Sequence, residues 1–438
     1  MHRVHMIILI LVAAPLAGGT LFAAESPTEP ADVLTLPEAV ALALTRSPEL
    51  SVYPYELRAA EARVLQKGLP PNPELEVEVE EFGGSGDLRG FDAAEASIAV
   101  GQPIELAGKR AKRRRLAVID RDLVERDYEA AKLDVVRDVT QAFVAVQAAQ
   151  ERLTVAERLL ELARRVQSIA VERVAAGKDA PVEELQADVV LSRSRIERQK
   201  AGRALEAARY TLAAKWGAAA PAFEAVAGEF FEPAPPVSLE EAVGGLGANP
   251  DLVRREVQEQ RSLAALRLEQ ARAVPDVTVG GGVLRFEETD SSAFLLSLSI
   301  PLPLFDRNQG GIREALAEIE KTRRQSEVVE IGMRTELVQA VTDLAAACEQ
   351  AAILREQVLP KAQEAFALAE EGFREGKFDY LYVLETERTL FDIQVEYIDA
   401  VETCHRRHAE VDRLTGGPPL TGDTENASSG TEQQTGIR

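Results

Sequence analysis

The sequence predicts a mixed α and β protein, made mostly of long coiled-coil helices with four strands and duplicated internally. The first indication is a run of 68 residues, Lys109 to Ala176, that contains neither Gly nor Pro. The second is strict alternation of Glu with apolar residues at 74–80, which is the period of a strand. The third is a set of landmarks that recur about 200 residues apart.

The landmarks keep a nearly constant offset. Three pairs are LPEAV at 36–40 and LEEAV at 239–243, SPEL at 47–50 and NPDL at 249–252, and Gly177 and Gly376, with offsets of 203, 202 and 199 residues. A steady offset indicates internal duplication. We expect a first repeat at 34–235 and a second at 236–417, each with a short helix, two strands, a long helix and a shorter helix.

Helix boundaries are predicted from capping residues and prolines. Ser47 and Asn249 each precede a Pro, so we expect both to open a helix. Pro54 should interrupt the first short helix. In the second repeat, helices at 250–273 and 380–415 add up to the length of the long helix at 312–374 and should cover it end to end.

Four strands are predicted at 74–82, 94–104, 276–286 and 293–300. The first carries glutamates on one face and apolar side chains on the other: Glu74, Glu76, Glu78 and Glu80 against Leu75, Val77 and Val79. The glutamates could line a solvated sheet edge, a cation site or the lumen of a water-filled barrel, and the lumen is preferred. Each strand has about the ~9–11 residues needed to cross a bilayer when tilted.

Aromatic residues gather beside the two predicted hairpin tips: Phe82, Phe91, Phe286 and Phe294. We expect a membrane-interface girdle, with chance clustering as the alternative. Four strands cannot close a barrel in a membrane, where no edge stays unpaired, so several chains must share one barrel. The glycines of VGGGV, at 279–283, should permit close packing inside a strand.

The first 24 residues have the pattern of a secretory signal, with Arg3 before a short apolar run and cleavage at Ala23 or Ala24. A linker is expected at 25–33 and a disordered, polar tail at 418–438. No other segment approaches ~20 consecutive apolar residues, so no transmembrane helix is predicted.

Charge and motifs exclude several function classes. The net charge of −22 argues against nucleic-acid binding, and the basic run KRAKRRR at 109–115 is expected to be a helix start with acidic neighbours. The run CHRRH at 404–408 is interpreted as surface helix residues rather than a metal site. The sequence has no catalytic triad, metal quartet or nucleotide fingerprint, so neither an enzyme nor a cofactor is predicted.

Two junctions and two tips show a resemblance over nearly the whole mature chain. They are QPIELAGKRAKR at 102–113, IPLPLFDRNQGG at 300–311, and the Gly-containing turns ERVAAGKDAPVEELQAD and EGFREGKFDYLYVLETERTL. The chain resembles the TolC-like outer membrane efflux protein family, and the first junction resembles its CzcC-like heavy-metal branch.

The resemblance implies a homotrimer with a twelve-stranded barrel in the outer membrane above a periplasmic α-barrel. It implies a duct without chemistry of its own, docked to a periplasmic adaptor and a proton-driven inner-membrane transporter of the RND type. Heavy-metal cations are the expected cargo. Drug efflux and type I protein secretion are alternatives, and a soluble periplasmic coiled-coil scaffold is the alternative from another class.

The resemblance also implies site residues. The periplasmic gate aligns with Val182, Glu183, Tyr382 and Glu385. The adaptor-docking tips align with Gly177, Lys178, Asp179, Gly376, Lys377, Phe378 and Asp379. Phe378 stands where well-known members carry a gate-linking Arg, so the closed state must be held differently.

The two cysteines lie at equal distances from Gly376, with Cys348 28 residues before it and Cys404 28 residues after it. An antiparallel helix pair turning there would place them at similar height. A disulfide is one alternative in the oxidising periplasm, and two inert helix thiols are the favoured one.

Overall fold

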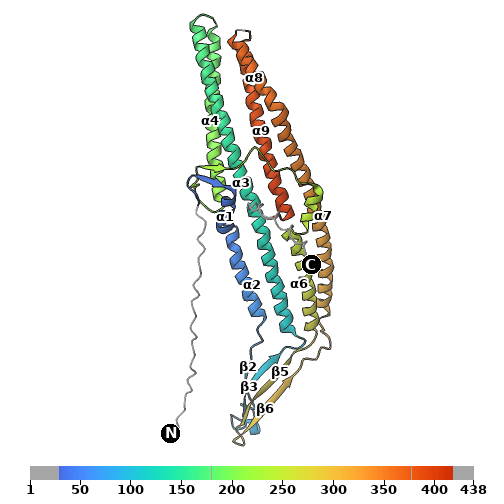
Figure 1. The fold of residues 1–438 in the computed structure, drawn as a ribbon. Helices are drawn as coiled ribbons and strands as arrows, with labels where there is room; N and C mark the ends of the chain where they lie inside the picture. Colours follow the sequence, from blue (N-terminus) through green and yellow to red (C-terminus); the bar gives the residue numbers. More distant parts are fainter. Residues whose placement is uncertain (1–28, 179, 376, 418–438) are drawn as a thin grey trace, which may run out of the picture.

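The computed structural model describes residues 29–178, 180–375 and 377–417. It is an elongated layer of helices with a small sheet at one end and two helical hairpins at the other (Figure 1). The expected signal and tail, together with Asp179 and Gly376, lie outside the described residues.

The helices are α1 Leu36–Arg46, α2 Tyr53–Lys67, α3 Lys109–Ala175, α4 Pro181–Ala214, α5 Leu239–Leu246, α6 Pro250–Arg272, α7 Gln309–Ile353, α8 Leu359–Arg374 and α9 Tyr380–Thr415. The strands are β1 Val33–Thr35, β2 Glu74–Glu80, β3 Glu95–Ile104, β4 Ala225–Ala227, β5 Val277–Phe286 and β6 Ser291–Ser299. The predicted long helices and four long strands are confirmed, with ends that differ by up to three residues.

The helical layer is built around α3. On one side α3 packs against α2 and α4, and on the other against α6 and α9. Helices α6 and α9 in turn pack against α7 and α8, so the predicted end-to-end covering is confirmed (Figure 1). The layer is therefore four helices wide, and its free edges are α2 with α4 and α7 with α8.

Helix α3 forms because no residue in it breaks the helix and its apolar residues recur at three- and four-residue spacing. Val139, Phe143 and Val146 are at most 2% exposed, in a core that includes α1 and Trp216. Burial of each such side chain contributes about 1.5–3 kcal/mol. This core sits near mid-height of the layer and ties α1 and the end of α4 to α3.

The second long helix is not uniform. Between α7 and α8 the chain forms a π-helix, Leu354–Val358, and Pro360 lies two residues after its end. Pro lacks an amide donor and crowds the preceding turn, so a π-helix accommodates it without ending the helix. The run Gln309–Arg374 is long and apolar enough to cross a membrane by composition, which the sequence reading did not predict. Its packing along α6 and α9 places it in the helical layer.

Two predictions for the helices near residues 47–54 were wrong, one of a helix start and one of an interruption. Ser47 ends α1, and a short 3₁₀ turn at Leu50–Val52 follows instead of an α-helix. Pro54 does not interrupt a helix but lies in the first turn of α2, where its missing amide donor costs nothing. Asn249 opens α6 as predicted, because its side chain accepts a hydrogen bond from the Asp251 amide.

A small parallel pair, β1 with β4, was not predicted from the sequence. It ties Val33–Thr35 to Ala225–Ala227, near the core around α3. Strands of three residues carry too little alternation to be recognised by pattern.

Candidate functional site

The long strands form one antiparallel sheet in the order β2-β3-β5-β6. Its register sorts side chains by face. Glu74, Glu76, Glu78 and Glu80 pair with Gly101, Ala99, Ser97 and Glu95. The opposite face of β2, Leu75, Val77 and Val79, pairs with Val100, Ile98 and Ala96 and continues through Val283 to Phe294, Leu296 and Leu298 of β6.

The apolar face is the most exposed apolar surface of the strands. Phe294 is 95% exposed, Leu296 85% and Leu75 69%. A patch of this kind in water is unfavourable, and it marks a surface that contacts lipid or another protein.

The glutamate face continues across β5 over small residues. Gly280 and Gly282 lie on it, and a Cβ atom on Gly282 would stand 2.3 Å from the Ile98 carbonyl oxygen. Because that neighbour is backbone, it cannot move aside. The expectation that VGGGV permits close packing is confirmed, and side chains on this part of the face stay small.

The predicted four-residue aromatic girdle was wrong in one member. Phe82 and Phe91 stack with ring centroids 5.5 Å apart, and Phe294 lies on the apolar face. Phe286 pairs with Glu95 and therefore lies on the glutamate face. The sequence reading placed all four by height alone, whereas strand register decides the face.

At the junction between sheet and helices, the basic start of α3 has the acidic neighbours predicted for it. Lys109 pairs with Asp276 at 2.7 Å, and Arg113 binds the Glu105 carboxylate with two nitrogens. Asp276 precedes β5, so this pair links the start of α3 to the start of β5 where the sheet meets the helices.

The first tip is the turn between α3 and α4. Gly177 has φ +68°, a left-handed conformation that glycine adopts without strain. The Lys178 amide donates to the Arg173 carbonyl at 2.9 Å, which satisfies one of the last carbonyls of α3. From the sequence, Gly177 and Gly376 are both expected to end a helix; Gly177 does so, and for Gly376 this stays a prediction.

The second tip, between α8 and α9, is held by aromatic packing. The Phe378 ring lies so close to Gly372 that a Cβ atom there would stand 2.2 Å from it. The same ring packs on Tyr382, with centroids 4.9 Å apart, and Asp379 accepts a hydrogen bond from the Tyr382 amide. Phe378 thus fixes the start of α9 from within the same hairpin.

The four candidate gate residues lie just after the tips. Val182 and Glu183 are in the first turn of α4, and Tyr382 and Glu385 are in the first two turns of α9. Val182 is 54% and Tyr382 47% exposed, and Glu385 is exposed. One chain places the two pairs on separate hairpins, so a gate formed by all four needs both hairpins to approach.

Near the tips the two hairpins meet through a small apolar cluster: Ala170, Ala187, Val166, Phe373 and Leu384. Arg173 of α3 lies over the Phe373 ring of α8 at 5.1 Å from its centroid. Sequence reasoning missed this contact, because helical spacing does not show which helix faces meet. This cation–π contact links α3 of the first hairpin directly to α8 of the second.

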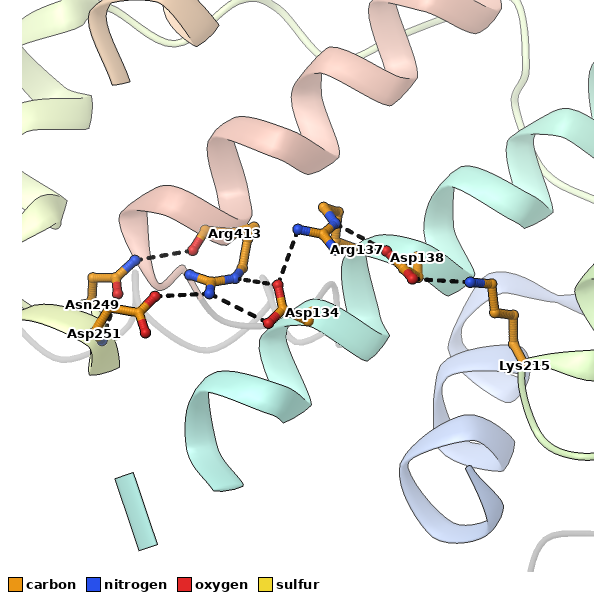
Figure 2. Close-up of polar contacts among 7 residues, drawn as sticks. All are labelled: Asp134, Arg137, Asp138, Lys215, Asn249, Asp251 and Arg413. Carbon is orange, nitrogen blue, oxygen red and sulfur yellow. Dashed lines mark hydrogen bonds and ion pairs between the residues drawn. The ribbon is translucent and has the colours of Figure 1, made fainter. Parts of the chain in front are cut away.

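At mid-height a chain of alternating charges joins four elements (Figure 2). Arg413 of α9 binds Asp134 of α3 and Asp251 of α6, both at 2.8 Å. Arg137 binds Asp134 at 3.0 Å and Asp138 at 2.8 Å.

Two further residues extend this network (Figure 2). Lys215, at the end of α4, binds Asp138 at 2.9 Å. The Asn249 amide donates to the Arg413 and Leu414 carbonyls, at 3.2 and 2.9 Å. Burial acts to raise the pKa of Asp138, and hydrogen bonds from Lys215 and Arg137 outweigh it, so that this pKa lies below its ordinary value. The network therefore links the end of α4 in the first hairpin and the end of α9 in the second to α3 and α6.

The cysteines and histidines correct two interpretations. Cys348 and Cys404 form a disulfide with Cα atoms 5.0 Å apart, so the favoured unbonded alternative was wrong. Cys404 is fully buried, and His405 bonds the Phe230 carbonyl at 2.8 Å, so CHRRH is an interior contact rather than a surface run. Within the part of the chain that the structure describes, no group of three His, Cys, Asp or Glu residues could hold a metal ion.

The outer membrane efflux protein family matches residues 39–218 and 245–417. The chain belongs to this family. Outer membrane efflux proteins are transport proteins of the outer membrane with a periplasmic extension, and the arrangement of sheet, hairpins and tips is this family's architecture. Channels of the family act as trimers in tripartite systems.

Among named relatives, this efflux protein is 33% identical over 402 residues to the cobalt-zinc-cadmium resistance protein CzcC of Cupriavidus metallidurans, covering 91% of this chain and 94% of that protein. It is 27% identical to the nickel-cobalt-cadmium resistance protein NccC of Alcaligenes xylosoxydans xylosoxydans, over 76% of this chain and 73% of that protein.

Solved structures share the fold. A membrane protein of Pseudomonas aeruginosa aligns with a TM-score of 0.72 at 20% identity, over 87% of this chain and 93% of that one. The channel CusC aligns with a TM-score of 0.71 at 18% identity, over 87% and 92%. These likenesses confirm the predicted fold of long helices with a small membrane sheet.

Proposed function

We propose that three copies of this chain form the outer-membrane exit duct of a proton-driven tripartite pump of the RND type, and that the duct passes divalent heavy-metal cations. This proposal rests on the 33% identity to a cobalt-zinc-cadmium resistance protein over 91% of this chain. The duct receives its cargo from a periplasmic adaptor and an inner-membrane transporter, and it performs no reaction.

The free edges of the helical layer support the trimer. Exposed apolar residues recur at helical spacing along α4: Val182, Leu185, Val189, Ile196 and Tyr210. The other edge carries a second row along α7 and α8: Leu316, Ile331, Val338, Ile353 and Leu368. Each row is a coiled-coil seam without a partner within the described chain. In a closed ring, α4 of one copy packs against α7 and α8 of the next.

The sheet supports both the barrel and a cation cargo. Edge strand β2 of one copy pairs with edge strand β6 of the next, because a membrane leaves no strand edge unpaired. The apolar face then contacts lipid and the glutamate face lines the lumen. Four glutamates per chain give twelve in three chains, and a carboxylate-lined pore favours cations over anions.

We assign the gate to Val182, Glu183, Tyr382 and Glu385, and adaptor docking to the two tips. The exposure of Val182, Tyr382 and Glu385 supports this assignment, because a gate residue must reach across the pore. The matched element order on either side of residue 236 supports two repeats, at 34–235 and 236–417.

Cellular metal content tests the function. Cells that lack this chain but keep its transporter and adaptor should retain several-fold more zinc, cadmium or cobalt than complemented cells. The same cells should differ little in their retention of organic dyes. Unchanged metal content together with trapped dye or trapped secreted protein would contradict the metal assignment and favour one of the other duct functions.

A further inference from the structure

Glu387, in the upper part of α9, carries a buried carboxyl group. The residue is 4% exposed, and both carboxylate oxygens find no hydrogen-bond donor among the described residues. Buried carboxylates in folded proteins are ordinarily paired or hydrogen-bonded, because an unpaired buried charge is strongly unfavourable. Its position therefore needs an explanation.

The surroundings of Glu387 are apolar. It lies in the buried stripe of α9 between Val383, 2% exposed, and Phe391, which packs in the core around Ile398. This stripe faces α3 and α8, because α9 packs against both.

No charged side chain at this height is buried with it. Two fixed points bracket the height on α3: Leu384 lies in the same apolar cluster as Val166, and Asp399 pairs with Arg152. Among the described residues, the charged side chains at that height are exposed, apart from the half-buried Glu197 of α4: Glu157, Arg158, Glu161, Arg164 and Arg165 of α3, Lys361, Glu364, Glu370 and Glu371 of α8, Glu385, Arg388 and Asp392 of α9, and Asp188, Arg193, Arg195 and Arg198 of α4.

Helix α9 is anchored to its neighbours more firmly below Glu387 than at the height of Glu387 itself. The disulfide Cys348–Cys404 joins α9 to α7, and Arg152 of α3 binds Asp399 and Glu402 of α9, both at 2.5 Å. The π-helix Leu354–Val358 lies above the disulfide in the facing helix. Above these anchors the hairpin meets α3 and α4 mainly through the small cluster around Phe373.

We propose that Glu387 is a protonation switch for the second hairpin: the neutral carboxyl keeps the upper part of α8 and α9 packed on α3, and the ionised carboxylate releases it toward an open gate. This inference rests on the proposed gate. It adds a site that takes up one proton per chain, distinct from the exposed gate residue Glu385.

The direction follows from the linkage between protonation and packing. Burial raises the pKa of Glu387 to about 7, from an ordinary value of 4.5. The packed hairpin therefore binds the proton more tightly than the released one does. Packing is unaffected below about pH 4.5, weakens as the pH rises toward 7, and stays constant above 7. The ratio of packed to released hairpin falls by up to about tenfold per pH unit in that window.

Hydrogen exchange on the purified trimer tests this switch. Backbone exchange of α9 residues 381–391 is measured from pH 5 to 8.5 in the wild type and in Glu387→Gln, which is isosteric and cannot ionise. The ratio of the two rates at each pH cancels the chemical pH dependence of exchange. We expect a ratio of about four at pH 5 that rises by up to about tenfold per unit and levels off near pH 7.

Two further variants secure the interpretation. Glu387→Met also cannot ionise and should behave as Glu387→Gln does, so that either variant suffices if the other assembles poorly. Glu396→Gln changes an exposed carboxylate of the same helix and should match the wild type at every pH. A rate ratio that does not change with pH for Glu387→Gln or Glu387→Met overturns the proposal.

This measurement needs no metal, adaptor or transporter. A flat ratio with normal metal efflux therefore rejects the switch alone. If the ratio of exchange rates changes with pH but the chain has no effect on cellular metal content, the proposed cargo is rejected and the switch stands.

Discussion

At the scale of single residues, the disulfide makes the sharpest stability prediction. Cys348 and Cys404 close a loop with a sequence separation of 56 residues. We expect Cys348→Ser with Cys404→Ser to lower stability by roughly 2–4 kcal/mol, because the cross-link restricts the unfolded chain. Thermal unfolding of the trimer, oxidised and reduced, measures this loss. Two alkylatable thiols in the denatured, non-reduced wild type would contradict the bond itself.

Gly177 makes a second residue-scale prediction. Its φ of +68° is strained by roughly 1–2 kcal/mol for a side chain with a Cβ atom. Gly177→Val should deform the first tip, so that metal export is lost while the protein still reaches the outer membrane. Gly202→Ala is the matched control, since a Cβ atom there meets nothing within 4 Å. Normal export by Gly177→Val would remove the first tip from docking.

The residue scale also shows where sequence reasoning ends. Gly177, Asn249 and the neighbours of Lys109 were predictable, because capping and charge act over short distances. Glu387 was not, because its burial depends on which faces of α3, α8 and α9 meet. The sequence predicted that the two cysteines lie at similar height. It did not predict the bond, because whether the two side chains face each other depends on how each helix is rotated about its axis.

At the scale of elements, the ion pair between Asp138 and Lys215 predicts that the contact between α3 and the end of α4 weakens in acid. The pKa of Asp138 is depressed, so its stabilising contribution is present above its ordinary pKa of 3.8 and is lost as the pH falls below that value. Lys215→Met should cost on the order of 1 kcal/mol at pH 7 and much less at pH 3. Unfolding midpoints at both pH values measure the difference. An equal loss at the two pH values would contradict an ionic origin.

Element types followed from the sequence better than element details. The long helices were predictable from the absence of Gly and Pro, and the strands from their alternation. The π-helix before Pro360 was not predictable. It arises where a proline falls inside a helix that tertiary packing keeps continuous. The face of Phe286 was not predicted, because the sequence shows the position of a residue along a strand, whereas the register with the neighbouring strands decides its face.

At the scale of the whole molecule, the two free edges predict the assembly. Ile331→Glu with Val338→Glu places two charges in the apolar row of α7, which should reduce trimer to monomer by destabilising the seam between copies. Gln325→Glu adds charge at another exposed position of the same helix and should leave the trimer intact. Light scattering in detergent distinguishes the two. A trimer unaffected by both changes would place the interface elsewhere.

The central claim is a carboxylate-lined trimeric duct that passes metal cations, and its most direct test is the reversal potential of the purified protein in a planar bilayer under a zinc chloride gradient. We predict a cation-selective current. Neutralising the lumen face by Glu74, Glu76, Glu78 and Glu80→Gln, or the gate by Glu385→Gln, should shift the reversal potential toward zero. An anion-selective current, or a selectivity that neither set of substitutions changes, would contradict the account.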